Sequence, residues 1–313
     1  MVTDTILFGD CRETLNEFDG KARMCVTSPP YYGLRDYGGE DKQIGQEQSP
    51  EEYIQSLVEV FRSVRDVLTD DGTLWVIIGD SYYNYRPGKG QSYPKQSVSK
   101  TNQNLPQACN KRANKLEGLK EKDLIGIPWM LAFALRSDGW YLRQDIIWHK
   151  PNPMPESVKD RCTKSHEYIF LFSKSKKYFY VNEAIKEPVK QDWGTRDRTK
   201  GKYHNEGSGL QPHSGLTKSY TTKNKRSVWS VTNKPYKGAH FAVYPPDLIE
   251  PCIKAGSEEG DIVLDPFMGS GTTALVAKSL QRHYIGCELH EEYGKLIQKR
   301  LSEKSFARLK LDD

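Results

Sequence analysis

Apolar residues recur along the chain with two different spacings, which predict strands and helices in alternation. Thr5–Phe8 and Met24–Thr27 are short apolar runs, and we expect both to form strands. A helix N-terminus is expected at Ser49, because Pro50 follows it and the acidic Glu52 comes three positions later. From Ile54 onward the apolar residues fall on one helical face. The first part of the chain therefore predicts two strands and then an amphipathic helix.

The alternation continues toward the C-terminal part. Asp70-Asp71-Gly72 is expected to end the helix, and Thr73–Ile78 has the continuous apolar character of a buried strand. The further elements that we predict are helices near 127–137, 246–255, 272–280 and 291–301, and strands near 144–148, 167–172, 262–264 and 284–287. Helices and strands in repeated alternation predict an α/β fold with a mostly parallel sheet.

Two segments interrupt this pattern and carry an excess of positive charge. Asn84–Lys122 holds nine Lys/Arg against two Glu, and Lys186–Arg226 holds ten Lys/Arg against four Asp/Glu. Basic side chains of this kind can contact the phosphates of a nucleic acid. A solvated or disordered loop without a ligand has the same composition, so both interpretations stay open from composition alone.

Composition adds limits on the class of protein. The 313 residues suffice for one large domain or one domain with an insertion, and the formal net charge is only +5. The six cysteines form no C-x-x-C pair and no zinc-like cluster with histidine, which favours reduced thiols and predicts no metal site. The N-terminus lacks the features of a signal peptide, and Trp129–Leu135, the most apolar stretch, is too short to span a bilayer. We therefore expect a soluble, cytoplasmic protein without a membrane partner.

The segment Val263–Ala274 has the features of a loop that binds a nucleotide-like cofactor. It follows a predicted strand, contains Gly269 and Gly271, and opens a predicted helix whose free N–H groups could face a ligand. Glu288 lies 19 residues after Gly269, at the end of the next strand, where an acid can accept hydrogen bonds from ribose hydroxyls. The glycine spacing also matches a dinucleotide fingerprint, but the 42 residues after Gly271 are too few for a second mononucleotide half. A tight turn without a ligand remains the alternative for this motif alone.

The segment Thr27–Tyr32 is the second candidate for chemistry. Its two prolines fix the loop and remove two N–H donors, which leaves backbone carbonyls and the Ser28 hydroxyl as acceptors beside aromatic rings. Such a set suits a planar ligand that bears an amino group. Taken alone, the segment could equally be a proline-rich turn covered by surface tyrosines.

Together, the two motifs resemble those of the beta-class, or permuted, DNA amino-methyltransferases. In that family a Ser/Asp-Pro-Pro-Tyr motif comes first and an Asp-Pro-Phe-x-Gly-Ser-Gly-Thr motif comes last, and the resemblance here covers nearly the whole chain. It implies a Rossmann-like α/β fold dependent on S-adenosylmethionine, with basic recognition segments inserted. It also implies that the segment from Phe241 to Ile249 closes over the methionine end of the cofactor. The cofactor-binding residues that it implies are Asp10, Asp265, Phe267, Gly269, Ser270, Gly271, Thr272 and Glu288.

The catalytic residues that the resemblance implies are Ser28, Pro29, Pro30 and Tyr31. A base amine is a poor nucleophile because its lone pair is delocalised into the ring. If Ser28 and the Pro29 carbonyl accept its two N–H bonds, the nitrogen can become tetrahedral while Tyr31 stacks on the flipped base. Serine at position 28 favours cytosine N4 as the target, since adenine members of the family mostly carry Asp or Asn there.

Three alternatives remain at this point. The first is the same reaction on adenine N6. The second is a protein glutamine methyltransferase, although in that family the cofactor motif precedes the Pro-Pro-Tyr motif, which is the reverse of the order here. The third is a non-enzymatic nucleic-acid-binding protein, which leaves both motifs unexplained.

The resemblance also implies the partner and the organisation of the chain. Double-stranded DNA is the expected partner, while a homodimer and a cognate restriction endonuclease are left open. We predict that DNA is contacted by Arg196, Arg198, Lys200, Lys202, Lys223, Lys225 and Arg226. The predicted layout is a catalytic half at 1–83, a basic insertion at 84–122, a continuation of the core at 123–185, a target-recognition region at 186–240 and a cofactor-binding part at 241–313.

Overall fold

The computed structural model describes residues 3–34, 42–83, 116, 118–189, 221–233 and 244–303. Contacts divide the chain into two units, Met1–Val181 with Ser227–Asp313, and Asn182–Arg226. The larger unit contains both sequence motifs.

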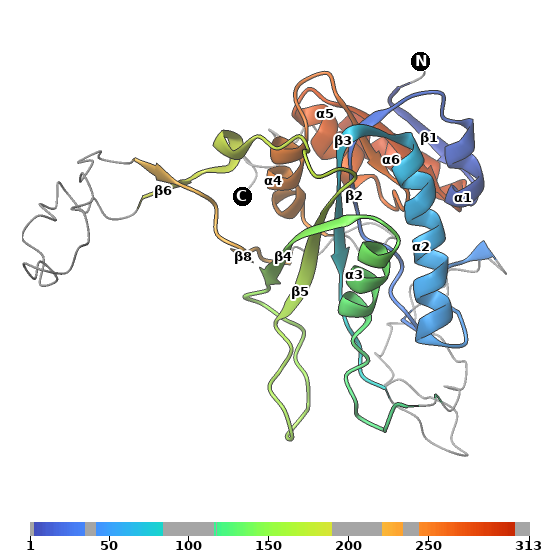
Figure 1. The fold of residues 1–313 in the computed structure, drawn as a ribbon, viewed down its shortest axis with the longest axis vertical. Coiled ribbons are helices and arrows are strands. Elements are labelled where there is room, and N and C mark those ends of the chain that lie inside the picture. The colour runs from blue at the N-terminus through green and yellow to red at the C-terminus, as the bar shows by residue number, and fades with distance from the viewer. Residues whose placement is uncertain are drawn as a thin grey trace, which may run out of the picture. The chain divides into compact units, whose positions relative to one another are not determined.

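The larger unit is built on a sheet that is mostly parallel, as the sequence predicts (Figure 1). Four neighbouring pairs at one side of the sheet are parallel, whereas β5 runs antiparallel to both of its neighbours. Among the described residues the eight strands lie in the order β1 (Thr5–Phe8), β10 (His283–Glu288), β9 (Ile262–Asp265), β2 (Ala22–Thr27), β3 (Leu68–Ile78), β5 (His166–Ser173), β4 (Tyr141–His149) and β8 (Val228–Ser230).

Helices cover both faces of this sheet. Leu74 and Val76 of β3 belong to the core that α2 (Pro50–Val67) and α3 (Ile127–Ser137) close, together with the short α1 (Cys11–Thr14) and η1 (Leu15–Glu17). Trp75 lies between Leu74 and Val76 in the chain and is fully buried. It must point to the opposite face of the sheet, because side chains alternate along a strand. That face carries α4 (Pro246–Gly256) and α5 (Thr272–Ser279), and α6 (Glu292–Glu303) contacts α5. Figure 1 shows α2 and α3 on one side of the sheet and α4 on the other.

The start of α2 follows the sequence prediction closely. The Ser49 hydroxyl accepts the Glu52 N–H at 3.2 Å, and Pro50 occupies the first helical position. The Glu52 carboxylate reaches back to the N–H of Gln48 at 3.0 Å. These contacts satisfy N–H groups near the helix start that have no partner within the helix.

The end of α2 differs from the prediction. β3 begins at Leu68, directly after the helix, whereas we expected Asp70-Asp71-Gly72 to separate the two elements. Leu68 pairs with Ala22 and Thr73 pairs with Met24. The four residues of β3 between Leu68 and Thr73 therefore lie opposite a single residue of β2, as in a large β-bulge. The acidic turn residues thus interrupt the strand pairing without ending the strand.

The smaller unit contains η3 (Asn182–Ile185) and a short antiparallel pair, β6 (Glu187–Pro188) and β7 (Thr222–Lys223). It overlaps the predicted recognition region from residue 186 to 226. Beyond it, β8 returns to the main sheet beside β4, and Trp229 of β8 is buried. The strand at 228–230 was not predicted, because three residues carry too little pattern to identify one.

Candidate active site

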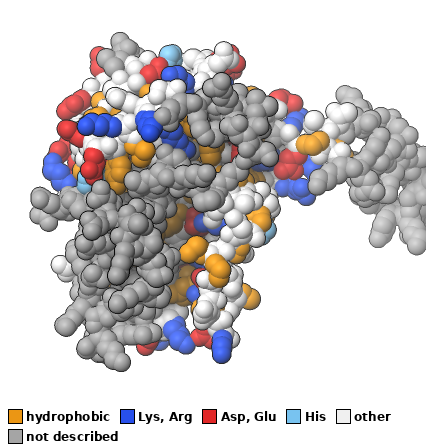
Figure 2. All heavy atoms as spheres, turned by 180° about the vertical axis from the view of Figure 1, so that it is seen from behind, with side chains coloured by type: hydrophobic (Ala, Val, Ile, Leu, Met, Phe, Trp, Pro, Cys, Tyr) orange, Lys and Arg blue, Asp and Glu red, His pale blue; other side chains and the backbone are white. Residues whose placement is uncertain are grey.

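A cavity of about 960 Å³ opens at the carboxyl ends of the parallel strands. Loops that follow β1, β2, β9 and β10 supply most of its lining. The loop after β4 adds to it, as do single residues of other elements, such as Glu167 of β5 and Tyr244 before α4. Open α/β sheets bind their ligands at this edge. Figure 2 shows a recess on the face seen from behind, with hydrophobic side chains beside it and charged side chains of both signs around it.

Both sequence motifs meet at this cavity, although they lie more than 230 residues apart in the chain, as the Thr27–Asp265 contact illustrates. All of Ser28, Pro29, Pro30 and Tyr31 line it. The predicted cofactor residues that line it are Asp10, Phe267, Gly269, Ser270, Thr272 and Glu288. Asp265 and Gly271 are not among the lining residues, and each has another position in the structure.

Asp265 lies beneath the cavity, with its side chain fully buried. One carboxylate oxygen accepts the Thr27 hydroxyl at 2.6 Å and the Phe267 N–H at 3.0 Å. The other accepts the Thr273 hydroxyl at 2.6 Å and the Tyr244 hydroxyl at 2.9 Å. Burial raises the pKa of this carboxyl group, and the hydrogen bonds from Thr27 and Thr273 oppose that rise. Asp265 thus joins β2, the loop after β9, α5 and the segment before α4.

Gly271 also has a packing role. Its φ is +78°, and a Cβ atom there would lie 2.8 Å from the side chain of Ile297. A side chain at this position would therefore displace α6 and strain the backbone. The other predicted glycine, Gly269, faces the cavity and has a φ of +52°.

Glu288 ends β10 and faces the cavity with a side chain that is only 8% exposed. Its two oxygens accept the N–H groups of Gly269 at 2.8 Å and of His290 at 3.1 Å. Burial raises the pKa of Glu288 to about 7, and these backbone N–H groups partly offset the rise. The group is a hydrogen-bond acceptor held at the cavity wall, where it retains lone pairs for a ligand hydroxyl.

Arg300 of α6 holds the start of α5, and the sequence pattern did not identify it. Its guanidinium donates to the Ser270 hydroxyl at 2.7 Å and carbonyl at 3.0 Å, and to the Thr272 hydroxyl at 3.0 Å. Ser270 and Thr272 line the cavity, so Arg300 fixes part of its wall from behind. Nothing in the local sequence around Arg300 distinguishes it from other basic residues of a surface helix.

Asp10 lines the cavity on the side of β1. Its carboxylate accepts the backbone N–H of Arg12 at 2.9 Å and the Arg12 guanidinium at 2.5 Å. Burial alone would raise the pKa of Asp10, but the hydrogen bonds and charge of Arg12 outweigh it and hold the pKa below its usual value. Asp10 is therefore an anionic group at the cavity in neutral solution.

The loop after β2 presents Ser28 and Tyr31 at the other end of the cavity. Tyr53 of α2 donates its hydroxyl to the Pro30 carbonyl at 2.8 Å and fixes the loop from below. The Tyr31 hydroxyl donates to the Glu167 carboxylate at 2.7 Å. Burial, followed by the charge of Glu167, raises the pKa of Tyr31 well above its usual value, so this phenol stays neutral.

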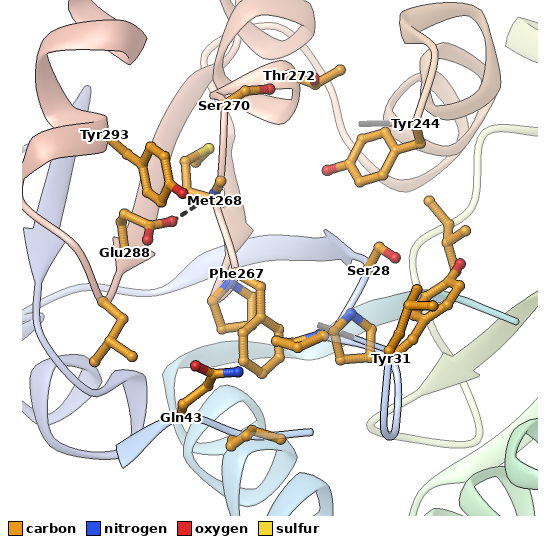
Figure 3. Close-up of a pocket in the computed structure, with 18 of the residues that line it drawn as sticks. Ser28, Tyr31, Gln43, Tyr244, Phe267, Met268, Ser270, Thr272, Glu288 and Tyr293 are labelled. Atoms are coloured by element: carbon orange, nitrogen blue, oxygen red, sulfur yellow. Dashed lines mark hydrogen bonds between the residues drawn. The ribbon is translucent and has the colours of Figure 1, made fainter. Parts of the chain in front are cut away.

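Figure 3 shows how the two ends of the cavity face each other. Glu288 and Tyr293 lie at one end, and Ser28 and Tyr31 lie at the other. Phe267 lies between the two groups. An elongated ligand held at Glu288 could therefore reach Ser28.

The predicted DNA-binding residues are only partly described. Arg196, Arg198, Lys200 and Lys202 lie outside the described residues. Lys223, Lys225 and Arg226 belong to the smaller unit, where Glu187 pairs with Arg226 at 3.2 Å and with Lys225 at 3.8 Å. The predicted insertion at 84–122 is described only at residues 116 and 118–122.

Metal-binding clusters and membrane-spanning helices are both absent from the described ranges. Within them, no group of three or more His, Cys, Asp or Glu side chains is arranged to hold a metal ion. No helix in those ranges is long and apolar enough to cross a membrane. The five described cysteines are free thiols, and Cys109 lies outside the described residues.

The chain was compared with known proteins. The family described as DNA methylase, which comprises N6 and N4 methyltransferases, matches residues 22–299. The chain is 48% identical over 297 residues to the type II methyltransferase M.SmaI of Serratia marcescens, covering 95% of this chain and 90% of that protein.

Solved structures share the fold. The cytosine-N4-specific PvuII DNA methyltransferase superposes with a TM-score of 0.64 at 19% identity, covering 100% of this chain and 91% of the other. A putative DNA modification methylase of Thermus thermophilus, solved with S-adenosyl-L-methionine, gives a TM-score of 0.57 at 22% identity, covering 96% and 93%. The fold is thus the α/β fold of these DNA methyltransferases, as the sequence predicts. With a family match over most of its length and a relative of nearly half identical sequence, the chain belongs to the DNA methylase family of N6 and N4 methyltransferases.

Proposed function

We propose that this protein transfers the methyl group of S-adenosylmethionine to the exocyclic N4 amino group of cytosine in double-stranded DNA. The observation that carries the proposal is the shared cavity, which has Ser28 and Tyr31 at one end and Glu288 at the other. The family assignment supports methyl transfer to DNA. The permuted order, with the catalytic motif before the cofactor motif, is part of the proposal.

The residues at the Glu288 end suit S-adenosylmethionine. A carboxylate that is buried, cavity-facing and only partly used by backbone N–H groups can accept hydrogen bonds from ribose hydroxyls. Phe267 offers an apolar face beside it, and a volume of about 960 Å³ leaves room for a cofactor together with a base. When bound, the cofactor supplies an activated methyl group on a positively charged sulfur.

Asp265 has a different part in this proposal from the one that the sequence indicated. Its four hydrogen bonds all run to protein groups, so it acts by fixing Phe267 and the start of α5. Tyr244, which the resemblance places near the methionine end, lines the cavity and is held by Asp265. Both residues position the cavity wall.

At the other end, the loop after β2 acts on the target amine. The Ser28 hydroxyl and the Pro29 carbonyl accept its two N–H bonds, while the Pro30 carbonyl is already engaged by Tyr53. This geometry directs the nitrogen lone pair toward the cavity, and the Tyr31 ring holds the flipped base in line. No covalent bond to the protein is required.

The choice of cytosine rests on two observations. Ser28 stands where the adenine members of the resembled family mostly have Asp or Asn, and the PvuII enzyme of the same fold is named cytosine-N4-specific. Adenine N6 is the second candidate, because the family includes methyltransferases of both kinds. DNA methylated by the purified protein, digested to nucleosides and analysed by mass spectrometry, decides between them. N4-methylcytosine is expected; N6-methyladenine would overturn the base assignment, and 5-methylcytosine would overturn the mechanism.

Sequence recognition is assigned in this proposal to the basic segment Lys186–Arg226. Its side chains can contact phosphates and read base edges. Charge reversal at Arg196 and Arg198 should weaken DNA binding and site preference while leaving cofactor affinity intact. If a folded variant keeps full DNA affinity and site preference, recognition belongs to the Asn84–Lys122 insertion instead.

A further inference from the structure

A half-buried ion pair lies at the cavity wall beside the catalytic loop. Lys150 follows β4 and Glu167 lies in β5, and the two strands pair so that Trp148 faces Glu167. The Lys150 ammonium bonds to one Glu167 oxygen and lies 4.1 Å from the centre of the Trp148 ring. The side chains of Lys150 and Glu167 are only 15% and 17% exposed. Withdrawing two charges even partly from water carries a desolvation cost, so the pair calls for a reason beyond stability.

The second oxygen of Glu167 is the one that binds Tyr31. Its 2.7 Å contact with the Tyr31 hydroxyl joins residues 136 positions apart in the chain. Lys150, Glu167 and Tyr31 all line the cavity. The Lys150–Glu167 pair therefore contacts Tyr31, the residue that stacks on the target base in the proposed function.

Gly79, just after β3, closes the other side of the tyrosine ring. A Cβ atom at Gly79 would lie 2.8 Å from Cε2 of Tyr31 and 3.3 Å from the Glu167 side chain. A residue larger than glycine would thus push against the ring. The ring is confined by backbone on one side and anchored by a charge-assisted hydrogen bond at its tip.

From these contacts we infer that Glu167, oriented by Lys150, is a positioning residue that fixes the Tyr31 ring as a preformed stacking platform for the target base. The inference rests on the proposed function. A tyrosine side chain that is free to rotate would lose conformational entropy each time a base stacked on it. The carboxylate removes that cost beforehand, because it holds the hydroxyl in one place.

A double-mutant cycle on the full chain tests this. Tyr31→Phe keeps the ring and removes the hydroxyl, and Glu167→Gln keeps the shape and removes the charge. Tyr31→Phe should slow methyl transfer in a single turnover by about 2- to 13-fold, the range expected when one preorganised side chain must be immobilised on binding. Glu167→Gln should slow it by a smaller factor, because the amide oxygen can still accept a neutral hydrogen bond from Tyr31. The double variant should be no slower than Tyr31→Phe alone, because the charge at position 167 acts on the ring only through the Tyr31 hydroxyl. Calorimetric affinity for S-adenosylmethionine should stay at its wild-type value, and the variants should remain folded at the assay temperature.

Matched variants separate positioning from general damage. Asp138→Asn breaks a different ion pair, between Asp138 and Arg62. The Asp138 side chain is 14% exposed and does not line the cavity, so the rate of methyl transfer should not change. If Glu167→Gln fails to fold because Lys150 is left without its partner, the pair can be replaced together by Lys150→Met and Glu167→Leu. In that background Tyr31→Phe should have no further effect on the rate.

Several results would overturn the inference. They are a wild-type rate in either single variant, effects that multiply in the double variant, or a loss of cofactor affinity that accounts for the slower rate. A wild-type protein that methylates no DNA amino group would overturn the proposed function instead. Crystal structures of the wild type and of Tyr31→Phe then test positioning without activity, and an unchanged, ordered aromatic ring at position 31 in the variant would count against it.

Discussion

The loop after β9 and the loop after β2 line opposite ends of one cavity, but they are held in different ways. The first is organised around one buried carboxylate, Asp265, and two of its four hydrogen bonds run to Phe267 and Thr273, within eight residues of itself. The second depends on Tyr53 and Glu167, which come from a helix and a strand elsewhere in the chain. Two of the four hydrogen bonds of Asp265 are therefore local, whereas both of these anchors of the catalytic loop come from distant elements. Damage to the two loops should have different consequences.

The largest effect is expected from Asp265→Ala. The change leaves buried hydroxyl and N–H donors without their acceptor, and each such group costs about 1–3 kcal/mol. We expect a loss of unfolding free energy of about 3 kcal/mol or more, together with loss of cofactor binding. Thermal denaturation and calorimetry measure the two effects. The control is Asp71→Asn, which removes a half-exposed partner of Arg23 and should change stability by less than about 1 kcal/mol.

A stable Asp265→Ala protein with normal cofactor affinity would show that the loop does not depend on its buried carboxylate. The cofactor loop would then differ from the catalytic loop in some other way than by a central carboxylate. Thr27 is informative here, because its hydroxyl joins the catalytic strand to Asp265. Thr27→Val should reproduce a fraction of the stability loss, since it removes one of the four donors.

The next effect concerns the ligand side of the same loop. Glu288→Ala removes an acceptor for ribose hydroxyls and should weaken the affinity for S-adenosylmethionine by about 1.5–3 kcal/mol. The matched control is Glu291→Ala, an exposed acid nearby that does not line the cavity. Isothermal titration calorimetry on both folded variants gives the comparison. Equal affinity in wild type and Glu288→Ala would remove Glu288 from the binding site.

The difference between the loops also explains what could be predicted from sequence. Glycines, a strand and a helix within a dozen residues specify the cofactor loop locally, so its place and most of its lining residues follow from the pattern. The pattern could not separate Gly269, which faces the cavity, from Gly271, which makes room for Ile297 of α6. Nor could it show that Asp265 points into the core. Spacing along the chain does not determine which side of a loop faces a ligand.

The fold shows the same limit. Most helices and strands follow from apolar periodicity, because burial on one face or two faces imposes that periodicity. The antiparallel β5 between β3 and β4 depends on pairing between distant segments, which periodicity does not encode. Glu167 did carry a signal, since a charged residue at the start of an otherwise apolar and aromatic strand is unusual. That signal indicates a partner but does not identify Tyr31.

At the catalytic end, Tyr31→Ala should separate chemistry from cofactor binding. Loss of the stacking face costs about 1–3 kcal/mol for a base held against an aromatic ring. We expect turnover to fall by about that amount while the affinity for S-adenosylmethionine stays nearly unchanged, the reverse of Glu288→Ala. Tyr141→Ala, which removes an exposed ring at the far end of β4, is the control. A Tyr31→Ala protein that turns over normally would contradict the stacking role.

Ser28→Ala should have a smaller effect at the same end. One acceptor for the target amine is lost, and the Pro29 carbonyl remains, so activity should fall without vanishing. A net hydrogen bond contributes about 0.5–1.5 kcal/mol, which corresponds to a rate loss of about 2- to 13-fold. Single-turnover methylation, with the cofactor saturating, measures the step directly. Complete loss of activity in a folded variant would mean that Ser28 does more than accept a hydrogen bond.

The smallest effect is a dependence of cofactor affinity on pH. Because burial raises the pKa of Glu288 to about 7, this side chain is mostly protonated below that pH and has fewer lone pairs for ribose hydroxyls. Affinity for S-adenosylmethionine should therefore weaken as pH falls from 8 to 6, by at most about tenfold per unit. The pKa of Asp10 is held low, so it stays ionised throughout this range. Glu288→Gln should bind more weakly and lose the dependence between pH 6 and 8. A slope that persists in Glu288→Gln would assign the titration to another group at the cavity.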